Sequence, residues 1–243
     1  MSNTFQFHTI GIIKSPYQEK FAIPRQPGLV TAAKGQIILQ DDANSSELIH
    51  AIEQFSHLWL IFVFHGNKQP KHDEKGWKPL VRPPRLGGNE KIGVLATRSP
   101  FRPNPIGMSV VKLDSINTKN NQTLLNVSGL DLLNGTPILD IKPYIPYTDS
   151  VINAQAGFAQ TTPTATLTVV FSTLAQAQLL TLQQQYLDLE LLITQVLAQD
   201  PRPAYKQNKL DEKIYGMVLY NLNIQWQLTS LTQVNVLNIT PQD

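Results

Sequence analysis

The chain has 243 residues, of which 42% are hydrophobic and 16% are charged, a composition that excludes a disordered protein. Its formal net charge of +2 is close to zero, so an anionic partner has to bind a local cluster of cations rather than the field of the whole chain. The absence of cysteine excludes a disulfide framework and a cysteine-ligated zinc site.

Short apolar segments separated by turn residues dominate the first part of the sequence. Strands are predicted at residues 8–17, 35–40, 58–64, 91–97, 107–116, 123–133 and 137–145. One helix is predicted from Asn44 to Phe55, because Asn44 and Glu47 form a capping pair before apolar residues at helical spacing. The continuous apolar run at 58–64 indicates a strand buried on both faces or another buried element. Many short strands of this kind suggest a barrel or sandwich.

The second part of the sequence has a different composition. Small and polar residues fill positions 153–165, which predicts a linker, and a strand is predicted after it at 166–171. A long helical stretch follows, with Thr173 and Gln176 as a capping pair, a break near Asp188 and an end at Asp200 before proline. Strands are predicted at 213–229 and 233–240.

These patterns predict a mainly β, α+β protein with two domains. The first, residues 1–152, is β-rich, and the second, residues 166–243, is a smaller α+β domain. The amino terminus lacks the long apolar core and cleavage site of a signal peptide. The longest apolar run is far shorter than the ~20 residues that a membrane helix needs, so we expect a soluble, cytoplasmic protein.

The sequence "RSPFRPNP", residues 98–105, carries the clearest functional pattern. Each proline fixes its own φ and keeps the preceding residue out of the helical region, so the loop is stiff and extended. Arg98, Arg102 and Asn104 therefore lose little backbone entropy on binding a ligand. A guanidinium group suits a carboxylate, a phosphate or a base edge, and Gly107 allows a close backbone approach. The alternative is a rigid crossover whose arginines form salt bridges.

Cations also accumulate before this loop. Arg82, Arg85, Lys91, Arg98 and Arg102 lie within 21 residues that contain a single acidic side chain. A polyanion such as RNA would bind such a run, because phosphate contacts supply most nonspecific affinity. A solvated basic loop explains the charge equally well.

Two further places have residues suited to proton transfer. Asp140, Lys142 and Tyr144 alternate along a predicted strand, which places them on one face, and His65 follows the apolar run at 58–64. A salt bridge with a half-buried tyrosine explains the first group equally well. The histidines have no metal-ligand spacing, and neither a dinucleotide fingerprint nor a phosphate loop is present. The residues alone thus indicate a rigid anion- or nucleotide-binding site on a β-rich domain.

The segment "GVLATRSPFRPNPIGMSV", residues 93–110, resembles the signature of the TsaA-like family, also called TrmO. "FSHLWLIFVFH", "VRPPRLGG" and "GLDLLNGTPILDIKPY" resemble other blocks of that family, and "AQDPRPAY" resembles the C-terminal portion of its longer bacterial members. One position departs from the pattern, since Asn134 stands where the family has aspartate. A neutral residue can serve in the same turn, so only a role for its charge is in question.

The resemblance implies a tRNA methyltransferase that depends on S-adenosylmethionine. Members methylate the exocyclic nitrogen of N6-threonylcarbamoyladenosine, next to the anticodon of threonine tRNA. The resemblance also implies a β-barrel unlike the Rossmann methyltransferases, and homodimers with the cofactor near the subunit interface.

Site residues follow from the matching motifs. For the cofactor, the resemblance implies Gln26, Pro27, Gly28, His65, Gly66, Arg98, Met108 and Asp131. For catalysis, we hypothesise that Asp140 or His65 is the base, with Tyr144 beside them, because the acceptor nitrogen has to lose a proton. For binding of the substrate and of RNA, we expect Arg82, Arg85, Arg102, Asn104, Lys142, Arg202 and Tyr205. We expect no metal site.

Two rival functions remain open from the sequence. A noncatalytic RNA-binding regulator would use the same basic groove without a cofactor. A small-molecule enzyme would use the rigid arginines on a free nucleotide or carboxylate. Around Arg202 and Tyr205, a helix-ending turn with solvated lysines is also a complete explanation.

Overall fold

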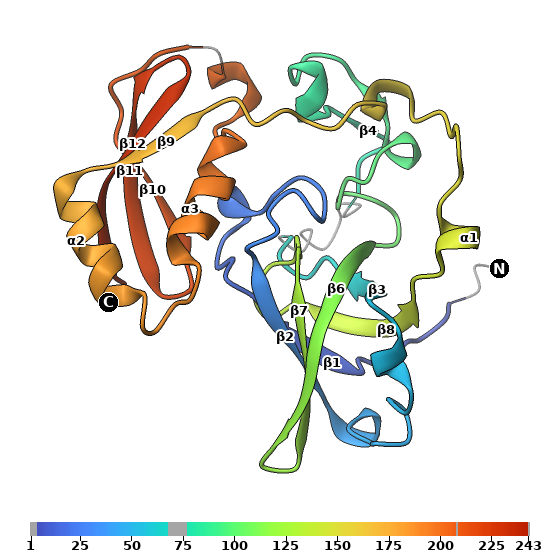
Figure 1. Cartoon of the computed structure of the whole chain (residues 1–243). Helices are drawn as coiled ribbons and strands as arrows, with labels where there is room; N and C mark the ends of the chain where they lie inside the picture. Colours follow the sequence, from blue (N-terminus) through green and yellow to red (C-terminus); the bar gives the residue numbers. More distant parts are fainter. Residues whose placement is uncertain (1–3, 68–76, 208, 243) are drawn as a thin grey trace.

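The computed structural model describes residues 4–67, 77–207 and 209–242. Its N-terminal part is a closed barrel in which every pair of neighbouring strands is antiparallel (Figure 1). Around the barrel the strands follow the order β1 (Gly11–Lys14), β2 (Lys34–Leu39), β7 (Gln122–Ser128), β6 (Ile106–Lys119), β3 (His57–Val63) and β8 (Pro137–Pro143). The mainly β, α+β class predicted from the sequence is confirmed.

The barrel interior is filled by alternate side chains of its strands. In β3, Leu58, Leu60 and Phe62 are at most 4% exposed, whereas the residues between them are only partly buried. The strand expected at 58–64 is therefore present, but it is buried on one face rather than on both. Its apolar outer side chains are half-covered by neighbouring segments, which is why the sequence shows no polar alternation there.

The helix expected at residues 44–55 is wrong. The segment forms turns and a single 3-10 helical turn, Ile52–Gln54, preceded by Ala51 with φ of 68°. Asn44 does not cap a helix, because its Oδ1 accepts from the backbone N–H of Thr123 at 2.8 Å. Its Nδ2 donates to the carbonyl of Asn121, also at 2.8 Å. Asn44 thus fastens the tip of the β6–β7 hairpin, a long-range use of a side chain that also favours helix caps.

Several expected strands are shorter than the sequence pattern indicated; the segment 8–17, for example, contains only the four residues of β1. The segment 91–97 contains only β5 (Ile92–Gly93), which pairs with β4 (Leu80–Val81), followed by a 3-10 turn at Val94–Ala96. The segment 123–133 leaves the barrel after Ser128, because Gly129 adopts φ of +72° and turns the chain. The residues after this turn, 131–136, lie at the end of the barrel where β3 ends.

The C-terminal part is a four-stranded sheet with two helices. Its strand order is β10 (Tyr215–Leu219), β11 (Leu222–Ser230), β12 (Gln233–Pro241) and β9 (Thr168–Phe171), with β9 parallel to β12. The helical stretch is divided into α2 (Thr173–Leu182) and α3 (Leu189–Ala198), so the break expected near Asp188 is confirmed. The N-cap of α2 is Ser172 rather than Thr173, since the Ser172 hydroxyl accepts from the Ala175 N–H at 3.1 Å.

The two parts share one continuous apolar core. The backbone N–H of Tyr220 donates to the carbonyl of Pro16 at 2.7 Å, and the ring of Phe21 stacks on Trp226 with centroids 6.5 Å apart. After β8, the chain passes through α1 (Pro146–Asp149) and crosses over the loops around β4 before it enters β9 (Figure 1). In the described parts of the chain, no helix is long and apolar enough to span a bilayer.

Candidate functional site

A pocket of about 790 Å³ lies at one end of the barrel, where β3 ends and β6 begins. Four segments form its walls: residues 20–26, the end of β3 with residues 64–67, the loop 95–104 together with the first residues of β6 (106–109), and residues 131–136. The rigid "RSPFRPNP" loop is therefore one wall of a pocket. Each of the other three segments also contains a residue that the sequence indicated.

Hydrogen bonds fix the rigid loop against its neighbours. Nη1 of Arg98 donates to Oε1 of Gln26 at 2.6 Å, and Nη1 of Arg102 donates to the carbonyl of Thr97 at 3.2 Å. Nδ2 of Asn67 donates to the carbonyl of Pro100 at 3.1 Å. These contacts orient both guanidinium groups, and each uses one of the five N–H donors of its guanidinium group.

The floor of the pocket is aromatic. The rings of Phe62 and Phe64 meet edge to face with centroids 5.3 Å apart. Gly107 lies directly beneath them, and a Cβ at this position would come within 2.4 Å of the Phe62 ring and 2.9 Å of the Phe64 ring. The close backbone approach expected at Gly107 is thus present, and what approaches it is the aromatic floor.

Gly107→Ala is expected to destabilise the protein by about 1–3 kcal/mol, because the new methyl group has to displace two packed rings. Thermal unfolding should show this as a lower melting temperature. Gly93→Ala is the matched control, since no atom lies within 4 Å of the Cβ built there. Equal melting temperatures for the two variants would contradict the packing described.

The charges around the pocket are unbalanced. Among the residues that the structure describes, Asp131 is the only acidic side chain in the wall, whereas Lys20, Arg25, Arg98 and Arg102 are cationic. Burial raises the pKa of Asp131 to about 6, although the hydroxyl of Ser109, which donates at 2.6 Å, and the charge of Arg98 act in the opposite direction. Burial also lowers the pKa of both Lys20 and Arg25. A single carboxyl group with a raised pKa among cations is typical of a functional site.

Most residues expected at the cofactor site converge on this pocket. Its wall includes Gln26, His65, Gly66, Arg98, Met108 and Asp131, together with Arg102 and Asn104, which were expected to bind substrate. Pro27 and Gly28 are not in the wall. Gly28 instead supports it, because its N–H donates to the carbonyl of Gly129 at 2.8 Å at the start of the loop that carries Asp131.

The structure does not bring Asp140, Lys142 or Tyr144 to the pocket. Asp140 and Lys142 form an exposed ion pair at 2.8 Å, and the ring of Tyr144 packs on Trp59 with centroids 5.9 Å apart. Lys142 is the register partner of Trp59, so the group lies on the side of the sheet that carries Trp59. The alternative reading of these residues, a salt bridge beside a half-buried tyrosine, describes this arrangement.

The upstream arginines also lie outside the pocket. Both Arg82 and Arg85 are exposed. Nη2 of Arg85 donates to the carbonyl and to the hydroxyl of Thr161, the latter at 3.0 Å. Arg85 therefore fastens the linker between the two parts of the protein, a role that local sequence could not reveal because the two residues are 76 positions apart.

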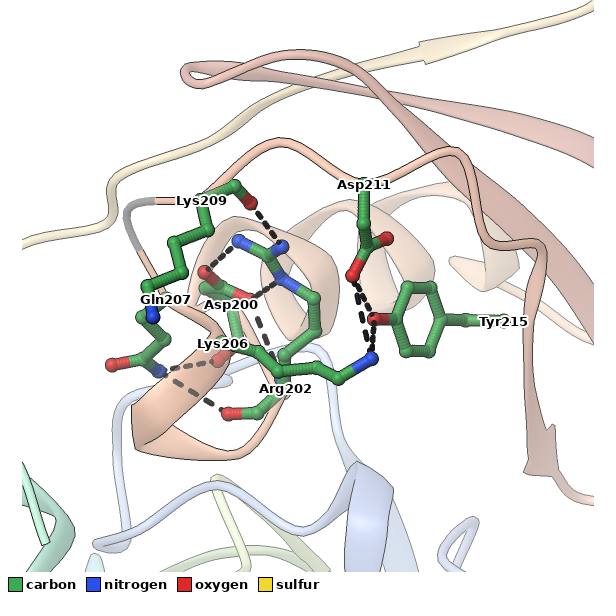
Figure 2. Close-up of polar contacts among 7 residues, drawn as sticks. All are labelled: Asp200, Arg202, Lys206, Gln207, Lys209, Asp211 and Tyr215. Atoms are coloured by element: carbon green, nitrogen blue, oxygen red, sulfur yellow. Dashed lines mark hydrogen bonds and ion pairs between the residues drawn. The ribbon is translucent and has the colours of Figure 1, made fainter.

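Arg202 is buried and cannot contact RNA in this conformation. Only 1% of it is exposed, and its Nε and Nη2 donate to the two oxygens of Asp200, each at 2.8 Å (Figure 2). Its Nη1 donates to the carbonyl of Lys209 at 2.9 Å. The expectation that Arg202 binds RNA is corrected, because this guanidinium holds together the loop after α3. Tyr205, by contrast, is 70% exposed.

Sequence reasoning missed several residues of the wall. Lys20, Arg25, Phe62 and Phe64 line the pocket, and so does Ser109, which is only 2% exposed. Ser109 immediately follows Met108 in the "IGMS" block, which was the available signal. The departure at Asn134 has a structural explanation: its Nδ2 donates to Gln18 at 3.1 Å, which an aspartate could not do.

Comparison with known proteins gives a consistent family. A family model described as tRNA-methyltransferase O N-terminal domain matches residues 12–150, and the TrmO C-terminal domain matches residues 164–242. A tRNA (adenine(37)-N6)-methyltransferase from Escherichia coli (strain K12) is 49% identical over 227 residues, covering 93% of this chain and 94% of that protein.

Two further comparisons extend over nearly the full length. A Pseudomonas aeruginosa protein, whose assigned name is that of an S-adenosylmethionine-dependent methyltransferase, is 43% identical over 244 residues, covering 99% of this chain and all of that protein. A crystal structure of TrmO from Pseudomonas aeruginosa superposes with a TM-score of 0.79 at 36% identity, covering 98% of this chain and 99% of that chain. The chain belongs to the TrmO family of tRNA methyltransferases.

Proposed function

We propose that this protein transfers a methyl group from S-adenosylmethionine to the exocyclic nitrogen of N6-threonylcarbamoyladenosine, next to the anticodon of threonine tRNA. The observation that carries the proposal is the pocket at the end of the barrel, in which the partly buried carboxylate of Asp131 lies within reach of the charge of Arg98 on a proline-stiffened loop. Family membership supports the reaction class.

The residues of the pocket fit this cofactor. When bound, S-adenosylmethionine supplies a methyl group on a positively charged sulfur. Among the described residues of the pocket wall, Asp131 is the acidic side chain that can bind the positively charged part of the cofactor. Arg98 can bind the carboxylate of the cofactor. Ile106 and Met108, which are 38% and 47% exposed, offer apolar surface for a purine ring.

For the substrate, we assign Arg102 to the threonyl carboxylate, with Asn104 beside it. Both residues lie in the wall on the stiff loop, so they are held before the substrate arrives. A guanidinium group that a bound substrate buries without providing a carboxylate partner is destabilising. The protein would therefore also reject unmodified adenosine.

For proton removal, we assign His65 rather than Asp140. His65 lies in the wall of the pocket, whereas Asp140 forms an exposed ion pair with Lys142 elsewhere on the barrel. The acceptor nitrogen has to lose a proton during attack, and a neutral imidazole within reach can accept it. Replacing His65 with glutamine should slow single-turnover methylation; an unchanged rate would remove His65 from this role.

The remaining assignments concern larger partners. We propose that the two parts are domains with boundaries at 1–152 and 166–243, and that exposed Tyr205 stacks on the RNA. A homodimer is supported by exposed apolar side chains around α1 and after it: Tyr147, Val151 and Ile152 are 89%, 70% and 85% exposed.

Asp131→Asn is expected to stabilise the protein and to impair cofactor binding. Because the folded pKa of about 6 exceeds the ordinary value of 3.8, the native state binds the proton more tightly, and stability falls as pH rises from about 4 to 6. Removing the charge should therefore add about 1–2 kcal/mol at pH 7. Affinity for S-adenosylmethionine should fall about tenfold. Thermal unfolding and calorimetric titration measure the two effects, and a stabilised variant with undiminished affinity would contradict the assignment.

The substrate assignment is tested with anticodon stem-loops that differ only at the threonyl carboxylate. One carries the free acid and the other its methyl ester. Wild-type protein should use the ester about 30-fold less well in kcat/KM, because a charged hydrogen-bonded pair contributes about 2 kcal/mol. Arg102→Ala should treat the two substrates nearly alike. A 30-fold preference that persists in Arg102→Ala would sink the assignment.

A further inference from the structure

Ser109 occupies an unusual position for a polar side chain. It lies on β6 between Gly107 and Val111, the two other positions of that strand segment that are buried, and only 2% of it is exposed. Its Oγ donates a hydrogen bond to Oδ1 of Asp131 at 2.6 Å. A hydroxyl facing the interior of a barrel needs a partner, and here the partner is the carboxylate in the pocket wall.

The groups that face Asp131 come from three segments. Arg98 on the stiff loop acts on it through its charge, Ser109 donates from β6, and the buried phenol of Tyr17, after β1, lies near enough for the Asp131 charge to help raise its pKa. Tyr17 Oη has no hydrogen-bond partner among the described residues. The carboxylate of Asp131 thus accepts hydrogen bonds from its own backbone N–H and from the side chain of Ser109, and the latter ties its direction to β6.

We propose that Ser109 is a positioning residue that holds the Asp131 carboxylate toward the pocket and in its charged form, ready for a cationic cofactor. The proposal rests on the proposed function, in which Asp131 binds the positive part of S-adenosylmethionine. Ser109 itself acts through Asp131 and does not need to touch the cofactor.

The expected signature is a shift in pH dependence rather than a uniform loss. A hydrogen bond donated to a carboxylate stabilises its ionised form, so its removal raises the pKa of Asp131 above about 6. Loss of such a bond should move the midpoint by about one pH unit. Cofactor affinity of Ser109→Ala should then be about fivefold below wild type at pH 6.0 and nearly equal to it at pH 8.5.

The experiment uses the full chain and calorimetric titration with S-adenosylmethionine from pH 5.5 to 8.5. Ser109→Thr keeps the hydroxyl and should restore the wild-type midpoint, whatever its effect on the absolute affinity. Ser128→Ala is the matched control, because Ser128 is 9% exposed and donates to Asp114 at 3.1 Å on a different side of the barrel. It should leave the midpoint unchanged.

A second readout needs no cofactor. Thermal unfolding of the free protein should show that the stability loss on raising pH, which in wild type ends near pH 6, continues to about pH 7 in Ser109→Ala. Ser109→Ala with an unshifted midpoint in both measurements would overturn the proposal. So would a uniform loss of affinity at every pH, which would show a packing role only. Failure of the underlying assignment looks different, because Asp131→Asn would then bind S-adenosylmethionine as tightly as wild type.

Discussion

Replacing Arg98 with alanine is expected to lower kcat/KM for methyl transfer about 100-fold. The guanidinium lies in the pocket wall, oriented by Gln26 at 2.6 Å, and its charge acts on Asp131. Its removal deletes a charge-assisted contact in a confined site and deprives Asp131 of a nearby opposite charge, which together are worth about 3 kcal/mol. Initial rates at low substrate concentration measure the effect.

Two further variants separate charge from shape at this position. Arg98→Lys keeps the charge but loses the planar fork, so it should recover only part of the activity. Lys119→Ala removes an exposed cation at the far end of β6 and should leave kcat/KM unchanged. If Arg98→Ala lost no more than Lys119→Ala, the pocket would not be the site of the reaction.

Arg202→Ala is expected to lower the free energy of unfolding by about 3–5 kcal/mol. The substitution leaves the carboxylate of Asp200, which is 5% exposed, buried without its two donors. It also frees the loop carbonyl of Lys209 (Figure 2). For a chain of this size the melting temperature should fall by roughly 10 °C.

The chain contains a matched control for this ion pair. Asp140 and Lys142 are likewise two positions apart and lie 2.8 Å from each other, but their side chains are 47% and 64% exposed. Lys142→Ala should therefore cost less than about 1 kcal/mol. The double variant Asp200→Asn, Arg202→Met should recover part of the loss, because asparagine tolerates the φ of 47° at position 200 and no buried charge remains. Equal effects of Arg202→Ala and Lys142→Ala would refute the burial argument.

Much of the fold could be predicted because alternation and turn residues are local signals. The sequence correctly predicted the helix break near Asp188 and the strand at 58–64. It did not predict that this strand is buried on one face only. The helix at 44–55 failed because Asn44 uses its side chain on a hairpin 77 residues away, which no local pattern encodes. Closure of the barrel decides such contacts, and closure depends on the whole chain.

The site was predictable where motif and geometry coincide. Arg98, Arg102 and Asn104 share one stiff loop, so a single stretch of sequence placed them together. Asp140 and Arg202 were misplaced because an acid on a strand and an arginine between prolines look the same whether buried, paired or free. Ser109 was missed because its importance depends on Asp131, 22 residues away, which only the turn at Gly129 brings to it.

The most direct test of the proposed reaction uses labelled S-adenosylmethionine and two pools of tRNA. One pool carries N6-threonylcarbamoyladenosine and the other comes from cells that cannot make it. We expect label in the first pool alone, and about 100-fold slower labelling with Arg98→Ala. Equal label in both pools would contradict the proposed substrate. No label in either pool, with tRNA still bound tightly, would contradict the reaction itself and leave a noncatalytic RNA-binding protein.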